Sequence, residues 1–226
     1  MTSNDFILEM KKKYNTKVAY TARLDPMARG IIPILIGDNC KYINTMTNTN
    51  KIYHVRIICG IKTDSDDPLG IICNLQTDID IDKFINIYRH IFELNNSTIH
   101  QKYHYFSTKA LKLRKQGKNI DSYHIVKLYK STILNYGTID YNIWKENIIS
   151  TIDNVDITKR NLNRFRQDDI IKQWNNISLN VLPYIDLELN VSSGFFVRQF
   201  ISDMNMNLMC YDINRINVYK CDSIIL

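Results

Sequence analysis

One segment sets the interpretation of the whole chain, and it reads Leu24-Asp25-Pro26-Met27-Ala28-Arg29-Gly30-Ile31-Ile32-Pro33-Ile34-Leu35-Ile36-Gly37. A single carboxylate precedes a proline and then a strongly apolar run bounded by glycines. Asp-Pro pairs start turns, so one interpretation is a connection with no chemistry. The other is that Asp25 stands at the lip of a cleft, on a loop braced by a buried segment that keeps a nucleophile in place and ionised. Spacing alone leaves both open.

Hydrophobic periodicity elsewhere predicts both strands and helices. Alternation of apolar and polar residues predicts strands over 53–60, 124–134 and 185–191. Helical spacing predicts a helix over 3–13 with Ser3 as its cap, a second from Asp80 or Asp82 to Phe92, and a third over 195–208. The order lacks a regular βαβ rhythm. We therefore predict an α+β fold with a mixed, largely antiparallel central sheet flanked by helices.

Length and composition predict one domain with a sizeable core. The chain has 226 residues, of which 45% are hydrophobic and 23% charged, which excludes a disordered tail. Residues 138–180 are polar and helix-leaning, and we interpret them as an insertion into a single catalytic domain spanning 1–226. No apolar run is long enough for a membrane span, and the first residues do not resemble a secretory signal. Five widely spaced cysteines favour free thiols in a reducing compartment, so a cytoplasmic location is expected.

The charge balance favours an anionic partner. The formal net charge is +6, which suits nucleic acid, although a bias towards residues with A/T-rich codons accounts for part of the lysine content. Cations interleave with aromatic residues after position 101, the composition that exposed RNA bases and phosphates call for. A solvated, lysine-rich helix is the alternative. The residues are Lys102, Lys109, Lys112, Arg114, Lys115 and Lys118, with Tyr103, Tyr105 and Phe106; a second basic cluster, Lys159, Arg160, Arg164 and Arg166, remains undecided.

Other candidate sites are weaker. His100 and His104 have the spacing of one helix face but lack the glutamate of a metalloprotease motif, so a solvated or RNA-facing pair is favoured over a metal site. The acidic segment 64–70 lacks the closing glutamate of a calcium loop and is interpreted as a polar turn between strands. No metal site and no cofactor are expected.

The Asp25 segment resembles the catalytic motif of the TruB family of tRNA pseudouridine synthases. Further stretches resemble that family in the same order along the chain. They are Ser3-Asn4-Asp5, Lys51-Ile52-Tyr53-His54-Val55, the turn from Gly60 to Gly70, Ser193-Gly194-Phe195-Phe196-Val197-Arg198, and Arg215-Ile216. Residues 138–180 are the main part of the chain outside the resemblance. The resemblance implies the pseudouridine synthase fold and a tRNA pseudouridine synthase activity on the T-loop uridine, without metal or organic cofactor.

The resemblance also implies residue roles. Asp25 would be the catalytic carboxylate, Arg198 its ion-pair partner, and Tyr53 the ring that stacks on the flipped uracil and takes part in proton transfer. Substrate contacts would come from Tyr20, Arg23, Lys51, Phe196 and Ile216, and the basic segment after residue 101 would clamp the T-arm of tRNA. A monomer is expected.

Departures from the family pattern keep alternatives open. The family histidine before the catalytic aspartate is Tyr20, its glycine is Ala22, and its tyrosine before the arginine is Phe196. The Lys-Pro-x-Gly strand and the C-terminal PUA domain of relatives have no counterpart, so we expect a compact form. A catalytically weak RNA-binding or RNA-folding protein, or a synthase acting on another RNA, remains the alternative.

Overall fold

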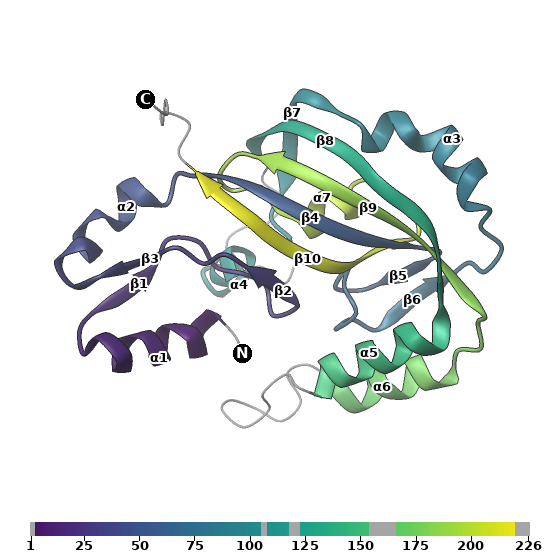
Figure 1. Ribbon diagram of the computed structural model, residues 1–226, viewed down its shortest axis with the longest axis horizontal. Helices are drawn as coiled ribbons and strands as arrows, with labels where there is room; N and C mark the ends of the chain where they lie inside the picture. The colour runs from purple at the N-terminus through teal and green to yellow at the C-terminus, as the bar shows by residue number, and fades with distance from the viewer. Residues whose placement is uncertain (1–2, 105–107, 118–122, 154–165, 220–226) are drawn as a thin grey trace.

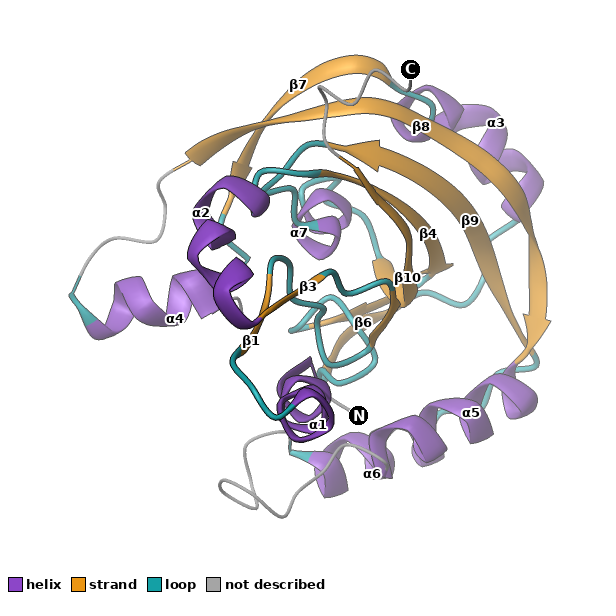
Figure 2. Ribbon diagram, turned by 60° about the vertical axis from the view of Figure 1, so that its left-hand side comes forward, coloured by secondary structure: helices purple, strands orange, loops and turns teal. Residues whose placement is uncertain are grey.

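The structure is a computed structural model that describes residues 3–104, 108–117, 123–153 and 166–219. Helices surround a strongly curved sheet, with α7 on its concave side and the α5–α6 pair side by side at one end (Figures 1 and 2). No described helix is long and apolar enough to cross a membrane. The helices are α1 (Ser3–Tyr14), a 3-10 helix η1 (Gly37–Tyr42), α2 (Ile43–Met46), α3 (Ile81–Phe92), α4 (Thr108–Lys115), α5 (Tyr141–Asp153), α6 (Gln167–Asn176) and α7 (Val197–Ser202).

Six strands form the main sheet in the order β2-β10-β4-β9-β8-β7. Only the β2–β10 pair is parallel, so the predicted mixed, largely antiparallel α+β architecture is confirmed. Two small sheets, β1–β3 and β5–β6, stand apart from it. The strands are β1 (Val18–Tyr20), β2 (Ala28–Gly30), β3 (Ile34–Ile36), β4 (Asn50–Cys59), β5 (Ile61–Thr63), β6 (Ile72–Leu75), β7 (Asn95–Lys102), β8 (Tyr123–Asp140), β9 (Val181–Val191) and β10 (Leu208–Tyr219).

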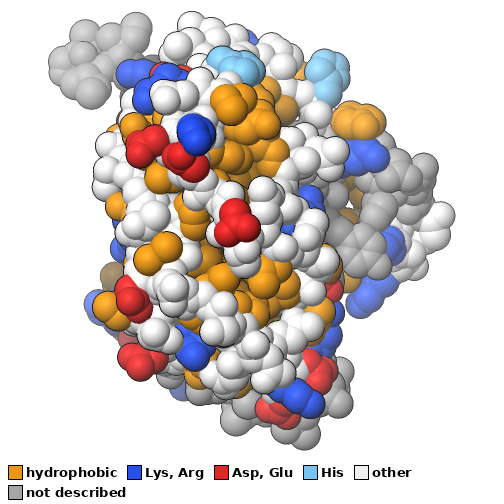
Figure 3. Space-filling view, turned by 90° about the vertical axis from the view of Figure 1, so that its right-hand side faces the viewer, with side chains coloured by type: hydrophobic (Ala, Val, Ile, Leu, Met, Phe, Trp, Pro, Cys, Tyr) orange, Lys and Arg blue, Asp and Glu red, His pale blue; other side chains and the backbone are white. Residues whose placement is uncertain are grey.

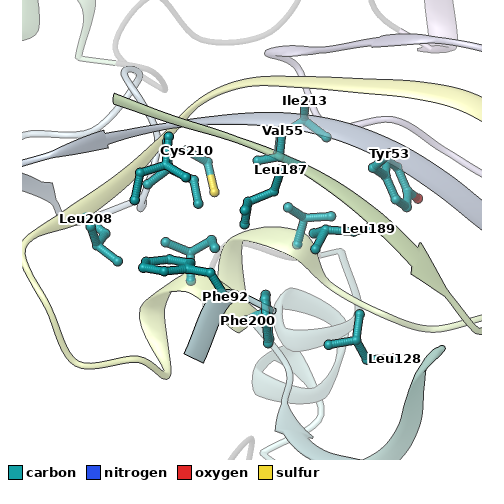
Figure 4. Close-up of a cluster of buried hydrophobic side chains, with 14 of the residues drawn as sticks. Tyr53, Val55, Phe92, Leu128, Leu187, Leu189, Phe200, Leu208, Cys210 and Ile213 are labelled. Atoms are coloured by element: carbon teal, nitrogen blue, oxygen red, sulfur yellow. The ribbon is translucent and has the colours of Figure 1, made fainter. Parts of the chain in front are cut away.

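The main core lies on the concave face of the sheet, which we call the front face. Alternate residues of the central strands point into it, and α3 and α7 cover it (Figure 4). A second core on the opposite face, the back face, joins α5 and α6 to the sheet through Trp144 and Trp174, both fully buried. Beyond these helices the surface is less completely covered: hydrophobic side chains reach it on the side shown in Figure 3, and Leu134 and Val181 are about half exposed.

Most predicted elements are confirmed, with two corrections. Asp80 caps α3 by accepting a hydrogen bond from the Lys83 amide, as one of the two expected caps. The strand predicted over 124–134 continues to Asp140 as β8. The helix predicted over 195–208 is wrong beyond Ser202: α7 has six residues, and β10 begins at Leu208. Asn205 adopts a left-handed backbone (φ 52°), which ends the helical path and turns the chain into the sheet.

Candidate active site

Asp25 lies on the loop between β1 and β2, and its side chain is 46% exposed. The first residue of α1 holds this loop, because the Ser3 hydroxyl accepts a hydrogen bond from the Leu24 amide (3.1 Å) and donates one to the Leu24 carbonyl (3.2 Å). Ser3 therefore bonds to the Asp25 loop, which the sequence did not predict. The Ala28 amide closes the turn on the Asp25 carbonyl oxygen at 2.9 Å.

The apolar run after Asp25 is not the buried brace of the second interpretation. Ile31 is 48% exposed, and all of β3 is only partly buried. The reason is topological, since this run pairs with β1 in a separate two-stranded sheet and stays out of the main core. Hydrogen bonds hold it, including one from the Thr21 amide to the Pro33 carbonyl (3.0 Å).

Arg198 is the second residue of α7, and its side chain reaches Asp25. Its Nε donates to Asp25 Oδ2 at 2.9 Å, and its side chain is only 8% exposed. The start of α7 is fixed by the fully buried Gln101, whose side-chain amide donates to the Phe196 carbonyl and accepts from the Phe196 amide, both at 2.8 Å. The sequence-predicted pair of Asp25 and Arg198 is therefore brought together across 173 positions of the chain.

A second carboxylate, Asp67, completes the site and was missed from the sequence. Arg198 Nη1 donates to Asp67 Oδ2 at 2.6 Å and to the Ser65 carbonyl at 3.1 Å. Asp67 is 4% exposed on its side chain, and its other oxygen accepts from the Ser65 hydroxyl (2.6 Å) and the Leu69 amide (3.0 Å). Burial raises the pKa of Asp67, against the lowering effect of the Arg198 charge. Arg198 is thus held by the buried Asp67, and it in turn positions the exposed carboxylate of Asp25.

Helix α6 supports the turn that carries Asp67. Arg166, at the start of α6, forms a two-bond ion pair with Asp64 (2.7 and 2.9 Å), and the Trp174 indole donates to the Pro68 carbonyl at 3.4 Å. Arg166 therefore pairs within the protein, while Lys159, Arg160 and Arg164 lie outside the described residues. The predicted turn over 64–70 is confirmed, and most of it is buried.

Tyr53 is 7% exposed at the edge of the main core, with its hydroxyl directed away from the apolar side chains (Figure 4). Burial raises its pKa, the nearby charge of Arg215 lowers the pKa, and the charge of Asp25 raises it. Tyr53 is therefore electrostatically coupled to Asp25. Lys51, two residues earlier on the same face of β4, is also buried; its Nζ donates to the Thr49 carbonyl at 2.5 Å.

The remaining predicted contacts occupy several places. The Arg23 guanidinium lies 6.0 Å from the centre of the Tyr20 ring, close in sequence to Asp25. Phe196 is half-buried, with its ring edge-on to His124 (5.5 Å between ring centres) and to Tyr103 (6.0 Å). Ile216 is half-buried where the register between β10 and β4 shifts.

The basic segment projects from the molecule. Lys102 ends β7, with its Nζ 5.4 Å from the centre of the Tyr123 ring, and α4 carries Lys112, Arg114 and Lys115 away from the sheet (Figure 2). The Lys109 side chain, together with Tyr105, Phe106 and Lys118, lies outside the described residues.

The histidine pair was predicted incorrectly. His100 is exposed on β7 and not on a helix, whereas His104 is 3% exposed, with Nε2 3.3 Å from Asp66 Oδ2. His100 lies on β7, whereas His104 follows the end of that strand, so the two side chains lie in different surroundings. In the described ranges, no three His, Cys, Asp or Glu residues gather as a metal site would require.

Residues 9–144 match the family model for the TruB family pseudouridylate synthase N-terminal domain. "tRNA pseudouridine synthase B" of Mycoplasma mycoides is 28% identical over 217 residues, which cover 91% of this chain and 68% of that protein. The protein of the same name in Wigglesworthia glossinidia brevipalpis is 34% identical over 124 residues, which cover 54% of this chain and only 36% of that protein.

A solved structure, "Crystal Structure of a Cbf5-Nop10-Gar1 Complex", is similar to 98% of this chain with a TM-score of 0.54 and 13% identity. This chain spans about half (47%) of the matched chain, and the likeness shows the fold. The family match covers more than half of the residues and includes Asp25, Tyr53 and Asp67. The chain belongs to the TruB family of pseudouridylate synthases.

Proposed function

We propose that this protein is a tRNA pseudouridine synthase that isomerises the T-loop uridine, with Asp25 as the catalytic carboxylate. Family membership and relatives named tRNA pseudouridine synthase B support the reaction class. The observation that carries the proposal is the chain of contacts from Asp25 through Arg198 to Asp67. An RNA-binding protein without catalysis has no need of an arginine held between two carboxylates.

The reaction requires the N1–C1′ bond of uridine to break, the uracil to turn, and a C5–C1′ bond to form, while C5 loses its proton and N1 gains one. Asp25 is exposed enough to approach C1′, and the charge-assisted hydrogen bond from Arg198 fixes the direction in which its carboxylate points. Tyr53 would stack on the extruded base and accept or return a proton through its hydroxyl. The isomerisation conserves atoms and oxidation state, so these residues can carry it without an added reactant.

The RNA partner would be bound mainly by the basic segment. Lys112, Arg114 and Lys115 lie on one short helix that projects beyond the sheet, where phosphate groups can reach them (Figure 2). Tyr20 and Arg23, which contact one another shortly before Asp25 in the chain, and Phe196, two residues before Arg198, would contact the bases next to the target uridine.

Incubation of the purified protein with an unmodified tRNA transcript tests the activity. We expect pseudouridine at the T-loop position alone, mapped by chemical footprinting of the product. Asp38→Asn, an exposed carboxylate on η1, is the matched control and should keep full activity. Binding of tRNA with no pseudouridine at any position would contradict the proposal and favour an RNA-folding role; modification of another RNA alone would contradict the T-loop assignment.

A minimal T-arm hairpin tests the partner. We expect it to be modified almost as efficiently as whole tRNA, and Lys112, Arg114 and Lys115 replaced together by Ala to weaken binding. The slope of log affinity against log salt should fall by about two to three units, because each lost phosphate contact removes roughly one. Unchanged affinity of the triple variant at every salt concentration would contradict this placement of the RNA-binding surface.

A further inference from the structure

Arg215, in the middle of β10, is only 1% exposed and is among the largest fully buried side chains. Within the part of the chain that the structure describes, its guanidinium bonds to three backbone carbonyl oxygens, and no carboxylate lies at ion-pair distance. A buried charge costs several kcal/mol to desolvate unless it is well bonded. The three hydrogen bonds of the Arg215 guanidinium offset this cost, and they hold the bonded carbonyl groups in fixed positions.

The three carbonyl groups flank Asp25 on both sides. Arg215 Nη2 donates to the Ala22 carbonyl at 2.9 Å and Nη1 to the Arg23 carbonyl at 3.0 Å. Its Nε donates to the Ile31 carbonyl at 2.7 Å, beyond Asp25. One planar side chain therefore ties the entrance and the exit of the catalytic loop to a central strand.

The backbone of Arg215 holds the same loop. Its carbonyl oxygen accepts a hydrogen bond from the Ile31 amide at 2.9 Å, and a Cβ added to Gly30 would lie 2.2 Å from that oxygen. Gly30 also has a φ of +113°, which L side chains rarely adopt. The loop thus runs in direct backbone contact with β10 at the residue whose side chain anchors it.

We propose that Arg215 is a positioning residue for catalysis: it fixes the loop backbone so that Asp25 meets the reacting sugar. This inference rests on the proposed function, but it assigns a role to a group that does not touch Asp25. Arg198 acts on the carboxylate directly, whereas Arg215 acts through the peptide groups on either side of it.

Arg215→Lys tests the proposal, because lysine keeps the charge but cannot bond three divergent carbonyls. Arg56→Lys is the matched control, since Arg56 makes a two-bond contact from the opposite face of β4. Three quantities are measured: the single-turnover rate at saturating tRNA, the RNA affinity, and amide hydrogen exchange. For Arg215→Lys we expect a rate loss of about 100-fold, as for a misplaced catalytic group, affinity within a few-fold, and faster exchange confined to residues 21–31.

A rate within a few-fold of the parent, or faster exchange spread over the whole protein, would overturn the proposal. Gly30→Ala is the second variant, because it displaces the loop from β10 and leaves the Arg215 side chain unchanged. It should show the same loss of rate with retained RNA affinity; parental kinetics in Gly30→Ala would also count against the proposal. Absence of pseudouridine with the parent protein would refute the proposed function, whereas the exchange measurement tests loop anchoring independently of activity.

Discussion

The two faces of the main sheet use arginine in opposite ways. On the back face, Arg56 bonds Asp186 through two contacts of 2.7 Å, and Arg29 bonds Asp212 at 2.7 and 3.1 Å. These pairs are partly exposed and line a hollow of about 570 Å³. On the front face, Arg198 and Arg215 are buried; the first shares two carboxylates and the second bonds carbonyl groups.

The arginines on the two faces differ in whether water can replace their contacts. A partly exposed pair on the back face contributes little, because water replaces each partner. A buried arginine on the front face has no such substitute, and its loss leaves carbonyl or carboxylate groups without a donor. The arrangement of the groups on the front face therefore depends on single arginines. Substitutions on the two faces test this contrast.

Asp25→Asn should have the largest effect. The amide keeps the shape of the side chain but cannot act as a nucleophile, so we expect no detectable pseudouridine and tRNA binding within a few-fold of the parent. Single-turnover assays and filter binding measure the two quantities. Measurable turnover by a clean preparation would remove Asp25 from the catalytic role.

Arg198→Lys should be the next most severe change. Lysine retains the charge but cannot span Asp25 and Asp67 with two directed donors. We expect a rate loss of about 100-fold or more, with the protein still folded. A lysine variant nearly as active as the parent would show that charge alone suffices. Arg198 would then be as replaceable as the arginines on the back face.

Lys51 measures the cost of a buried charge on the front face. Burial, and then the charge of Arg215, lower its pKa from 10.5 to about 8, which corresponds to roughly 3 kcal/mol at most. The folded state disfavours the charged amine, so this penalty is complete below pH 8 and vanishes above pH 10.5, where the unfolded state is also neutral.

We therefore expect Lys51→Met to raise the free energy of unfolding at pH 7, by less than that bound, and to lose the gain at about pH 10.5. Denaturant titrations at the two pH values measure this. The exposed Lys130→Met is the control and should change little at either pH. An equal gain at both pH values would mean that the effect comes from packing and not from charge.

Arg56→Gln should have the smallest effect. Loss of a partly exposed ion pair with Asp186 should change the free energy of unfolding by about 1 kcal/mol or less, with pseudouridine formation unaltered. Thermal unfolding and the single-turnover rate measure the outcome. Inactivation comparable to that of Arg198→Lys would abolish the distinction between the two faces.

The fold was predictable where periodicity is local. Alternation identified the cores of β4 and β9, and an aspartate cap identified the start of α3. Prediction failed after Ser202, where apolar residues at helical spacing continue into a turn and a strand. A positive backbone angle at Asn205 ends that helix, and the spacing of the side chains carries no information about it.

The site was predictable through its motif but not through its support. The Asp25 segment and the Phe196–Arg198 segment pointed to two partners that do meet. Asp67 was part of a recognised turn, yet nothing in its sequence neighbourhood indicates that it binds a residue 131 positions away. The same holds for Arg215, which was noted beside Ile216 without a role. Contacts over such separations follow from the topology of the sheet.

These long separations also have a consequence for the order in which the protein is made. The bonds that Arg198 and Arg215 make to Asp25 and its loop join residues 173 to 193 positions apart. At typical translation rates, Asp25 is added to the growing chain roughly 10 to 40 seconds before Arg215 is added. Throughout that interval the loop that carries Asp25 lacks its contacts with Arg215. The Asp25 loop can therefore gain its Arg215 anchor only after β10 has been made and has joined the sheet.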